Sequence, residues 1–126
     1  MALNNPESPV DLNELVDIRD ADASLFKSII DQYLMDIPGH VEALQKAQVQ
    51  RDAEAIGQQA HFFRGSSANF RANAFVDVCG RMETQAHSGN LQNMTVLMNE
   101  FTRELQRVRE ALEAEQRKCA PGAEDV

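Results

Sequence analysis

The chain has 126 residues, a formal net charge of −8 and a pI near 4.8, and its Lys and Arg residues form no cluster along the sequence. This length suits one domain with one core, and the negative charge argues against binding to nucleic acid or to an anionic membrane surface. Hydrophobic residues make up 43% and charged residues 25% of the chain, as in globular proteins, and no apolar run is long enough to span a bilayer. The first residues lack the basic and apolar segments of a signal peptide, so we expect a cytoplasmic protein.

Helices account for the whole predicted fold. Apolar residues recur at steps of three and four, and no segment alternates apolar and polar residues with a period of two. Short connections between long amphipathic helices indicate an all-α, antiparallel up-and-down four-helix bundle with an additional short N-terminal helix. We expect this bundle to cover residues 11–117 as a single domain, with flexible ends at residues 1–10 and 118–126.

The first helices are predicted to begin at aspartates. Asp11 and Glu14 have the spacing of a capping box, which predicts a short helix from Asp11, and the next helix is expected to follow Asp22. Asp36 and Pro38 are typical of an N-cap and a first turn, so we expect them to end this helix and to begin another. The apolar stripe expected before that break consists of Leu25, Phe26, Ile29, Ile30, Tyr33, Leu34 and Ile37.

Three further helices are expected. Asp52 is a good N-cap for a long helix, residues 73–87 are predicted to form the next one, Gly89 to end it, and residues 91–112 to form the last. The two cysteines match neither a redox pair nor a zinc motif, so they are interpreted as reduced thiols without a chemical role. The side chains expected to face the core from these helices are Ile56, Ala60, Phe63, Ser67, Phe70, Phe75, Val78, Cys79, Met82, Ala86, Leu91, Met94, Leu97, Met98, Phe101, Leu105, Val108 and Leu112.

His61 has an unusual setting on the helix that follows Asp52. It lies about 160° around the helix from Phe63, so if Phe63 faces the core, His61 points outward. Gly57, Arg64 and Gly65 are its neighbours on the helix surface. A glycine inside a helix costs about 0.8–1 kcal/mol relative to alanine, and a purely structural helix gains nothing from two of them. The pattern favours a histidine that a partner approaches closely, with Arg64 beside an incoming anion, as for a phosphoryl acceptor. A chance pairing of a surface histidine with glycines remains the alternative.

Residues 60–70 read AHFFRGSSANF and resemble the signature helix of histidine-containing phosphotransfer (HPt) domains. That signature is Ala-His, a variable and an apolar residue, Lys-Gly, and then small residues. The resemblance covers about residues 10–110. It implies a helical bundle that accepts a phosphoryl group on a histidine from the aspartyl phosphate of one receiver domain and passes it to another. The residues outside the signature helix that support it are Asp36, Ile37, Pro38, Leu44, Ala47, Asp52, Cys79, Met82, Glu83 and Gly89.

The sequence departs from the family pattern at two positions. Arg64 stands where the family has a lysine, which keeps the charge but changes its shape and reach. Arg71 stands where the family usually has a glycine. Either this second change alters how the helix ends, with Asn69 providing the left-handed turn, or it adds a basic contact for an acidic partner.

The resemblance also implies a role for individual residues. His61 is the expected phospho-acceptor and attacks through Nε2, Arg64 is expected to balance the phosphoryl charge, and Glu83 is expected to accept a hydrogen bond from Nδ1 of His61 and so orient it. An ordinary solvated carboxylate is the alternative for Glu83. No cofactor of its own is expected, because the partner receiver domain supplies Mg²⁺. The residues expected to contact that partner are Gly57, Gln58, Gly65, Ala68, Asn69 and Arg71.

Other functions are weighed against this one. A bundle of the same fold that docks on a receiver domain or histidine kinase without transferring phosphate is the main alternative. An enzyme with its own active site lacks a nucleophile with a base, and no glycine loop is present for a nucleotide. Glu83 and His87 have i, i+4 spacing but lack the further ligands of a metal site, and His40 and His87 are not expected to be phosphorylated. The expected partners are receiver domains of response regulators or of a hybrid sensor histidine kinase, and we expect a monomer.

Overall fold

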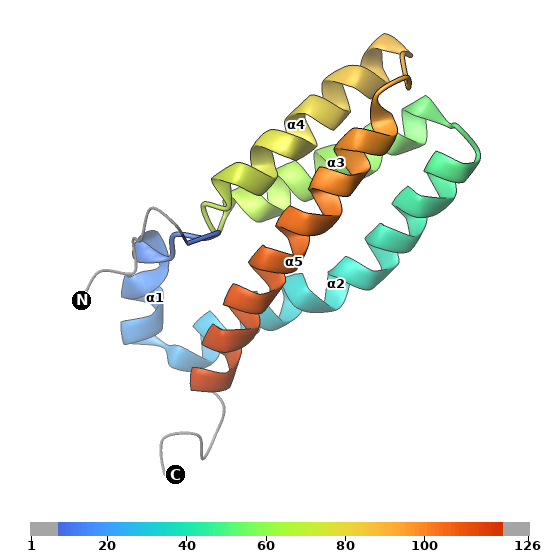
Figure 1. Cartoon of the computed structure of the whole chain (residues 1–126). Coiled ribbons are helices and arrows are strands. Elements are labelled where there is room, and N and C mark those ends of the chain that lie inside the picture. Colours follow the sequence, from blue (N-terminus) through green and yellow to red (C-terminus); the bar gives the residue numbers. More distant parts are fainter. Residues whose placement is uncertain (1–7, 120–126) are drawn as a thin grey trace.

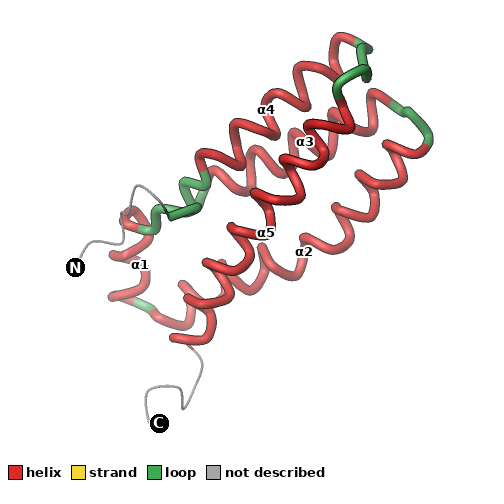
Figure 2. The backbone as a smooth tube through the Cα atoms, viewed as in Figure 1, coloured by secondary structure: helices red, strands yellow, loops and turns green. Residues whose placement is uncertain are grey.

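The computed structural model describes residues 8–119 of the chain, which form helices and no strand within that range. The long helices α2 to α5 lie side by side and run alternately up and down (Figures 1 and 2). The short helix α1 lies at the end of the bundle where α2 begins and α3 ends (Figure 1). The predicted fold class is therefore confirmed. The elements are a 3-10 helix η1 (Asn13–Leu15), α1 (Val16–Ala21), α2 (Ala23–Val49), α3 (Ala53–Ala68), α4 (Asn73–Ser88) and α5 (Met94–Cys119).

The core of the bundle is built around an aromatic cluster. The ring of Phe63 on α3 lies 5.9 Å from that of Phe75 on α4 and 5.1 Å from that of Phe101 on α5, and all three side chains are buried. Near the end of α3, the hydroxyls of Tyr33 and Ser67 form a buried hydrogen bond of 2.7 Å. These contacts fix the rotation of α3 about its axis, because each edge-to-face aromatic pair adds about 0.5–1.5 kcal/mol beyond the area that it buries.

Local chemistry explains where most helices begin and end. Asp22 and Asp52 accept hydrogen bonds from the backbone N–H groups three residues on, at 3.0 and 3.1 Å, so both are N-caps as predicted. Gly89 ends α4 with a left-handed φ of 78°. The predicted capping box is wrong, because Asp11 accepts from the N–H of Asn13 and Glu14 instead forms an ion pair with Arg71.

The break predicted at Asp36 and Pro38 is also wrong, because α2 is continuous through Pro38. A proline inside a helix costs about 3 kcal/mol, since it lacks the N–H for a hydrogen bond and its ring crowds the preceding turn. Buried side chains lie on both sides of it in α2, Ile37 before and Leu44 after, and this continuous packing offsets the cost. Asp36 does not cap a helix; it accepts a hydrogen bond from the side chain of Gln32.

The turn after α3 contains a left-handed arginine. Asn69 has a φ of −59° and is right-handed, so the prediction of a left-handed turn at Asn69 is wrong. Arg71 itself has a φ of 52°, and Arg51 before α3 has a φ of 53°. The left-handed region is readily adopted by glycine and unfavourable for other residues, which explains why glycine suits position 71.

The N-terminal segment closes one end of the bundle. Val10 and Leu12 are buried in the core, and the N–H of Asp11 between them donates to the carbonyl oxygen of Phe70 at 2.9 Å. This places the segment beside the turn between α3 and α4 (Figure 1). At the other terminus α5 continues to Cys119. The rest of the expected flexible ends, residues 1–7 and 120–126, lies outside the described residues.

Most of the predicted core is buried, with one informative exception. Met94 and Met98 are buried, in keeping with a packing role. Cys79 is a free, buried cysteine, and burial raises the pKa of its thiol to about 12, so it is protonated and unreactive at neutral pH. Cys119 is partly buried and also free. Leu25 was expected in the core but is 49% exposed at the start of α2.

Candidate functional site

His61 lies on the solvent side of α3, as its angle from Phe63 predicted. Its side chain is 66% exposed, whereas Phe63 is fully buried. The two glycines beside it have different surroundings. A Cβ added at Gly65 would meet nothing within 4 Å, whereas one at Gly57 would lie 3.5 Å from the Cβ of Ala86 on α4. Gly57 therefore borders the contact between two helices, and Gly65 leaves bare surface next to the imidazole.

Glu83 on α4 holds the imidazole of His61 through its other nitrogen. The Nδ1 atom of His61 lies 2.8 Å from Oε2 of Glu83. An ionised carboxylate only accepts hydrogen bonds, so Nδ1 carries the proton and, in the neutral ring, Nε2 keeps its lone pair. The contact expected from the sequence is thus present, and Glu83 is not simply a solvated carboxylate. Its role in orienting a nucleophile remains a prediction.

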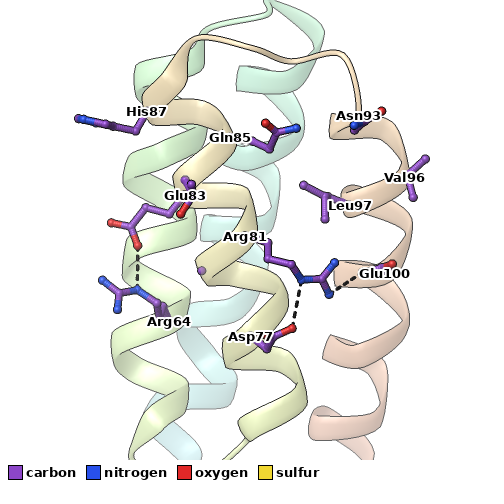
Figure 3. A pocket seen from close by; sticks show the side chains of 12 residues that line it. Arg64, Asp77, Arg81, Glu83, Gln85, His87, Asn93, Val96, Leu97 and Glu100 are labelled. Atoms are coloured by element: carbon purple, nitrogen blue, oxygen red, sulfur yellow. Dashed lines mark hydrogen bonds and ion pairs between the residues drawn. The ribbon is translucent and has the colours of Figure 1, made fainter.

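Arg64 binds the same carboxylate. Its Nε donates to Oε1 of Glu83 at 2.7 Å, as Figure 3 shows, and its Nη2 lies 3.3 Å from Nδ1 of His61. Since a guanidinium only donates and Nδ1 already carries a proton, the contact between Arg64 and His61 is not a hydrogen bond. The three side chains come from two adjacent helices, so a cation, a carboxylate and an imidazole meet at one exposed point. That Arg64 balances the charge of a phosphoryl group stays a prediction.

The surface around this cluster is hollowed on two sides. A hollow of about 400 Å³ borders His61 and is also lined by Gly57, Gln58, Glu83 and His87. A larger groove of about 1050 Å³ lies between α4 and α5. Figure 3 shows this groove, with Glu83 pointing toward Arg64 at one edge. On this face the imidazole is open to an approaching protein.

The remaining residues expected at a partner surface share one face of α3 and the turn after it. All are exposed except Gly57, which is half-buried. A second groove, of about 480 Å³, continues this face between α3 and α2 and is lined in part by Leu25, Ile29, Phe62 and Asn69. The sequence reasoning missed Leu25 as a surface residue because the residue fits the apolar stripe of α2. The expected partner residues are Gly57, Gln58, Gly65, Ala68, Asn69 and Arg71.

The other two histidines have different surroundings. His40 on α2 is half-buried, its Nδ1 lies 2.8 Å from Oε1 of Gln59, and its ring stacks on Phe62 with centroids 3.6 Å apart. His87 is exposed near the end of α4 and borders both the hollow at His61 and the larger groove. Across residues 8–119, no group of three or more His, Cys, Asp or Glu residues is arranged to hold a metal ion. Within the same range no helix combines the length and apolar character needed to cross a membrane.

The chain is similar to known proteins in sequence and in fold. The family described as Hpt domain matches residues 28–116. The crystal structure of histidine-containing phosphotransfer protein B from Pseudomonas aeruginosa PAO1 is similar, with a TM-score of 0.81 and 25% sequence identity over 89% of this chain and 97% of that one. No curated protein matches the sequence. The family match spans α3 and α4 entirely, and therefore includes the cluster of His61, Arg64 and Glu83.

Proposed function

The chain belongs to the Hpt domain family, whose members are phosphocarriers rather than kinases or hydrolases, and we propose that it carries the phosphoryl group on His61. Its function is histidine phosphotransfer in a phosphorelay, and the alternative of docking without transfer is not favoured. The observation that supports His61 is its geometry. It is exposed beside the bare surface of Gly65, and Glu83 binds its Nδ1, which leaves Nε2 available as a nucleophile.

The transfer step follows from this arrangement. Nε2 of His61 attacks the phosphorus of an aspartyl phosphate on the partner, and the new N–P bond forms as the P–O bond to the aspartate breaks. The leaving group is the partner's carboxylate, and no proton has to move. Positive charge develops on the imidazole ring as the bond forms, and the Glu83 carboxylate at 2.8 Å from Nδ1 stabilises it. The reverse step passes the group to the next aspartate.

The partner completes the site. A receiver domain brings its acidic pocket and the Mg²⁺ that neutralises the phosphoryl oxygens, so this chain needs no metal or cofactor of its own and no separate kinase or hydrolase site. The exposed face of α3, with Gly65, Ala68 and Asn69, is the proposed contact surface. Receiver domains of response regulators or of a hybrid sensor kinase are the proposed partners. We propose that the protein acts as a cytoplasmic monomer.

Transfer of radiolabel from a phosphorylated receiver domain tests this proposal. Wild type should acquire label that is labile in acid and stable in alkali, and His61→Gln should acquire none. The matched control is His87→Gln, because His87 is also exposed and borders the same hollow as His61. It should be labelled like wild type. Label that persists on His61→Gln would show that another residue is the carrier, whereas binding without any transfer would favour the docking protein.

A further inference from the structure

In the unphosphorylated protein, Arg64 contacts the Nδ1 side of the His61 ring and the carboxylate of Glu83. Its Nη2 lies 3.3 Å from Nδ1, and its Nε is bonded to Oε1 of Glu83 at 2.7 Å. A group on Nε2 projects away from the nitrogen that faces Glu83, because the two nitrogens are separated by a carbon in the ring. The charge of Arg64 is thus directed at the carboxylate.

The carboxylate of Glu83 is held at both oxygens by residues one helical turn apart on α3. Oε1 accepts from Arg64 and Oε2 from His61, at 2.7 and 2.8 Å. Glu83 is 29% exposed, so without a partner on Oε1 the side chain is able to rotate toward water and away from the imidazole. The bond from Arg64 removes that freedom. A planar guanidinium with several donors suits this task better than the single ammonium of a lysine.

The surface of α4 makes room for this contact. A Cβ added at Gly80 would lie 3.7 Å from Cδ of Arg64, so the stem of the arginine crosses α4 at a position that has no side chain. Gly80 precedes Glu83 by three residues, and the two therefore lie on the same side of α4. The stem passes over Gly80 and the guanidinium reaches Glu83.

We propose that Arg64 is a positioning residue that acts through Glu83: it holds the carboxylate so that Nδ1 of His61 keeps its proton and Nε2 stays unprotonated. This inference rests on the proposed role of His61. It gives Arg64 a part in the unphosphorylated protein, before any partner has bound. Arg64 and Glu83 then act on the imidazole together, so the loss of either side chain should shift the proton from Nδ1 toward Nε2.

The first measurement is the tautomer of His61 in the unphosphorylated protein, from its ¹⁵N chemical shifts at a pH where the ring is neutral. Wild type should carry the proton on Nδ1. Arg64→Met, which keeps an apolar stem, and Glu83→Gln should both shift the proton toward Nε2. The matched control is Arg81→Met, because Arg81 is 48% exposed against 45% for Arg64 and pairs with Asp77 and Glu100 instead. An Arg64→Met protein with the wild-type tautomer would overturn the proposal.

The second measurement is a double-mutant cycle on the transfer rate. We expect Glu83→Gln to lower the rate about tenfold and Arg64→Met about three- to tenfold, the size of one exposed charge-assisted hydrogen bond. The variant with both changes should be no slower than Glu83→Gln alone. If the two losses multiply instead, Arg64 acts on the phosphoryl group directly and the proposal fails. If no receiver domain labels the wild type, the function proposed for His61 fails. The tautomer of His61 measured by ¹⁵N chemical shifts still decides the role of Arg64 in that case.

Discussion

A single methyl group at position 65 should make the protein more stable and less active. Gly65 lies inside α3, and a Cβ there would meet nothing within 4 Å. Gly65→Ala should therefore raise the free energy of unfolding by about 0.8–1 kcal/mol, the helix propensity difference at an exposed position. For a chain of this size the midpoint of thermal unfolding should rise by roughly 4 °C.

The same methyl group should hinder transfer. It would occupy the surface next to His61 that the partner's phosphorylated aspartate has to approach. An extra methyl in a closely packed contact costs about 1–3 kcal/mol, so transfer at limiting protein concentration should slow by roughly five- to 150-fold. Stability is measured by thermal and urea unfolding followed by circular dichroism, and transfer by the radiolabel assay.

Gly39 provides the control for this experiment. It lies inside α2, and a Cβ added there also meets nothing within 4 Å. Gly39→Ala should show the same gain in stability with transfer at the wild-type rate. A Gly65→Ala protein that is more stable and transfers normally would refute the interpretation that the glycine admits the partner. A loss of stability would refute the assignment of open space at this position.

Three further predictions concern the scaffold. Arg51 and Arg71 have left-handed φ values, so Gly should give a higher free energy of unfolding than Ala at each position, by about 1 kcal/mol in urea titrations; the opposite order at both would contradict the φ values. Tyr33→Phe should lower the free energy of unfolding by about 1–3 kcal/mol in the same titrations, because the Ser67 hydroxyl is left buried without its partner. An unchanged free energy of unfolding would argue against the hydrogen bond between Tyr33 and Ser67. Burial raises the pKa of Tyr33 and of Cys79 to about 12, so the unfolded chain releases protons from pH 9 to 10 that the folded state keeps. Stability should fall as the pH rises above about 9, with a shallower fall in Cys79→Ala; a flat profile would count against both shifts.

The fold was largely predictable because most of its signals are local. An aspartate N-cap or a glycine at a helix end acts on backbone groups within a few residues, and Asp22, Asp52 and Gly89 all act as predicted. The continuity of α2 at Pro38 was not predictable in this way. It depends on whether the packing of a long helix against its neighbours outweighs the cost of a proline, and the sequence does not show that packing.

The candidate site likewise combines features that depend on one helix, which are predictable, with features that depend on two helices, which are not. The exposure of His61 follows from its angle to Phe63 on one helix, which the sequence contains. The direction of Arg64 depends on the adjacent helix, where Gly80 carries no side chain and Glu83 supplies the carboxylate. The charge of Arg64 is therefore predictable from the sequence, but the group that it binds is not. A left-handed turn at Asn69 is one of two alternatives that the sequence leaves open, because asparagine tolerates that conformation, but the φ values place the turn at Arg71.

The packing of Val10 and Leu12 has a consequence for the design of truncated proteins. The family match begins at residue 28, inside α2, so a fragment cut to residues 28–116 would lack the start of that helix and both of these side chains. At the end of the bundle where the carbonyl oxygen of Phe70 accepts from the N–H of Asp11, the core would then lack two of its apolar side chains. Such a fragment should self-associate through this end at concentrations where the full chain stays dispersed. Expression plasmids for this domain should therefore begin upstream of residue 10, well before the boundary that sequence similarity suggests.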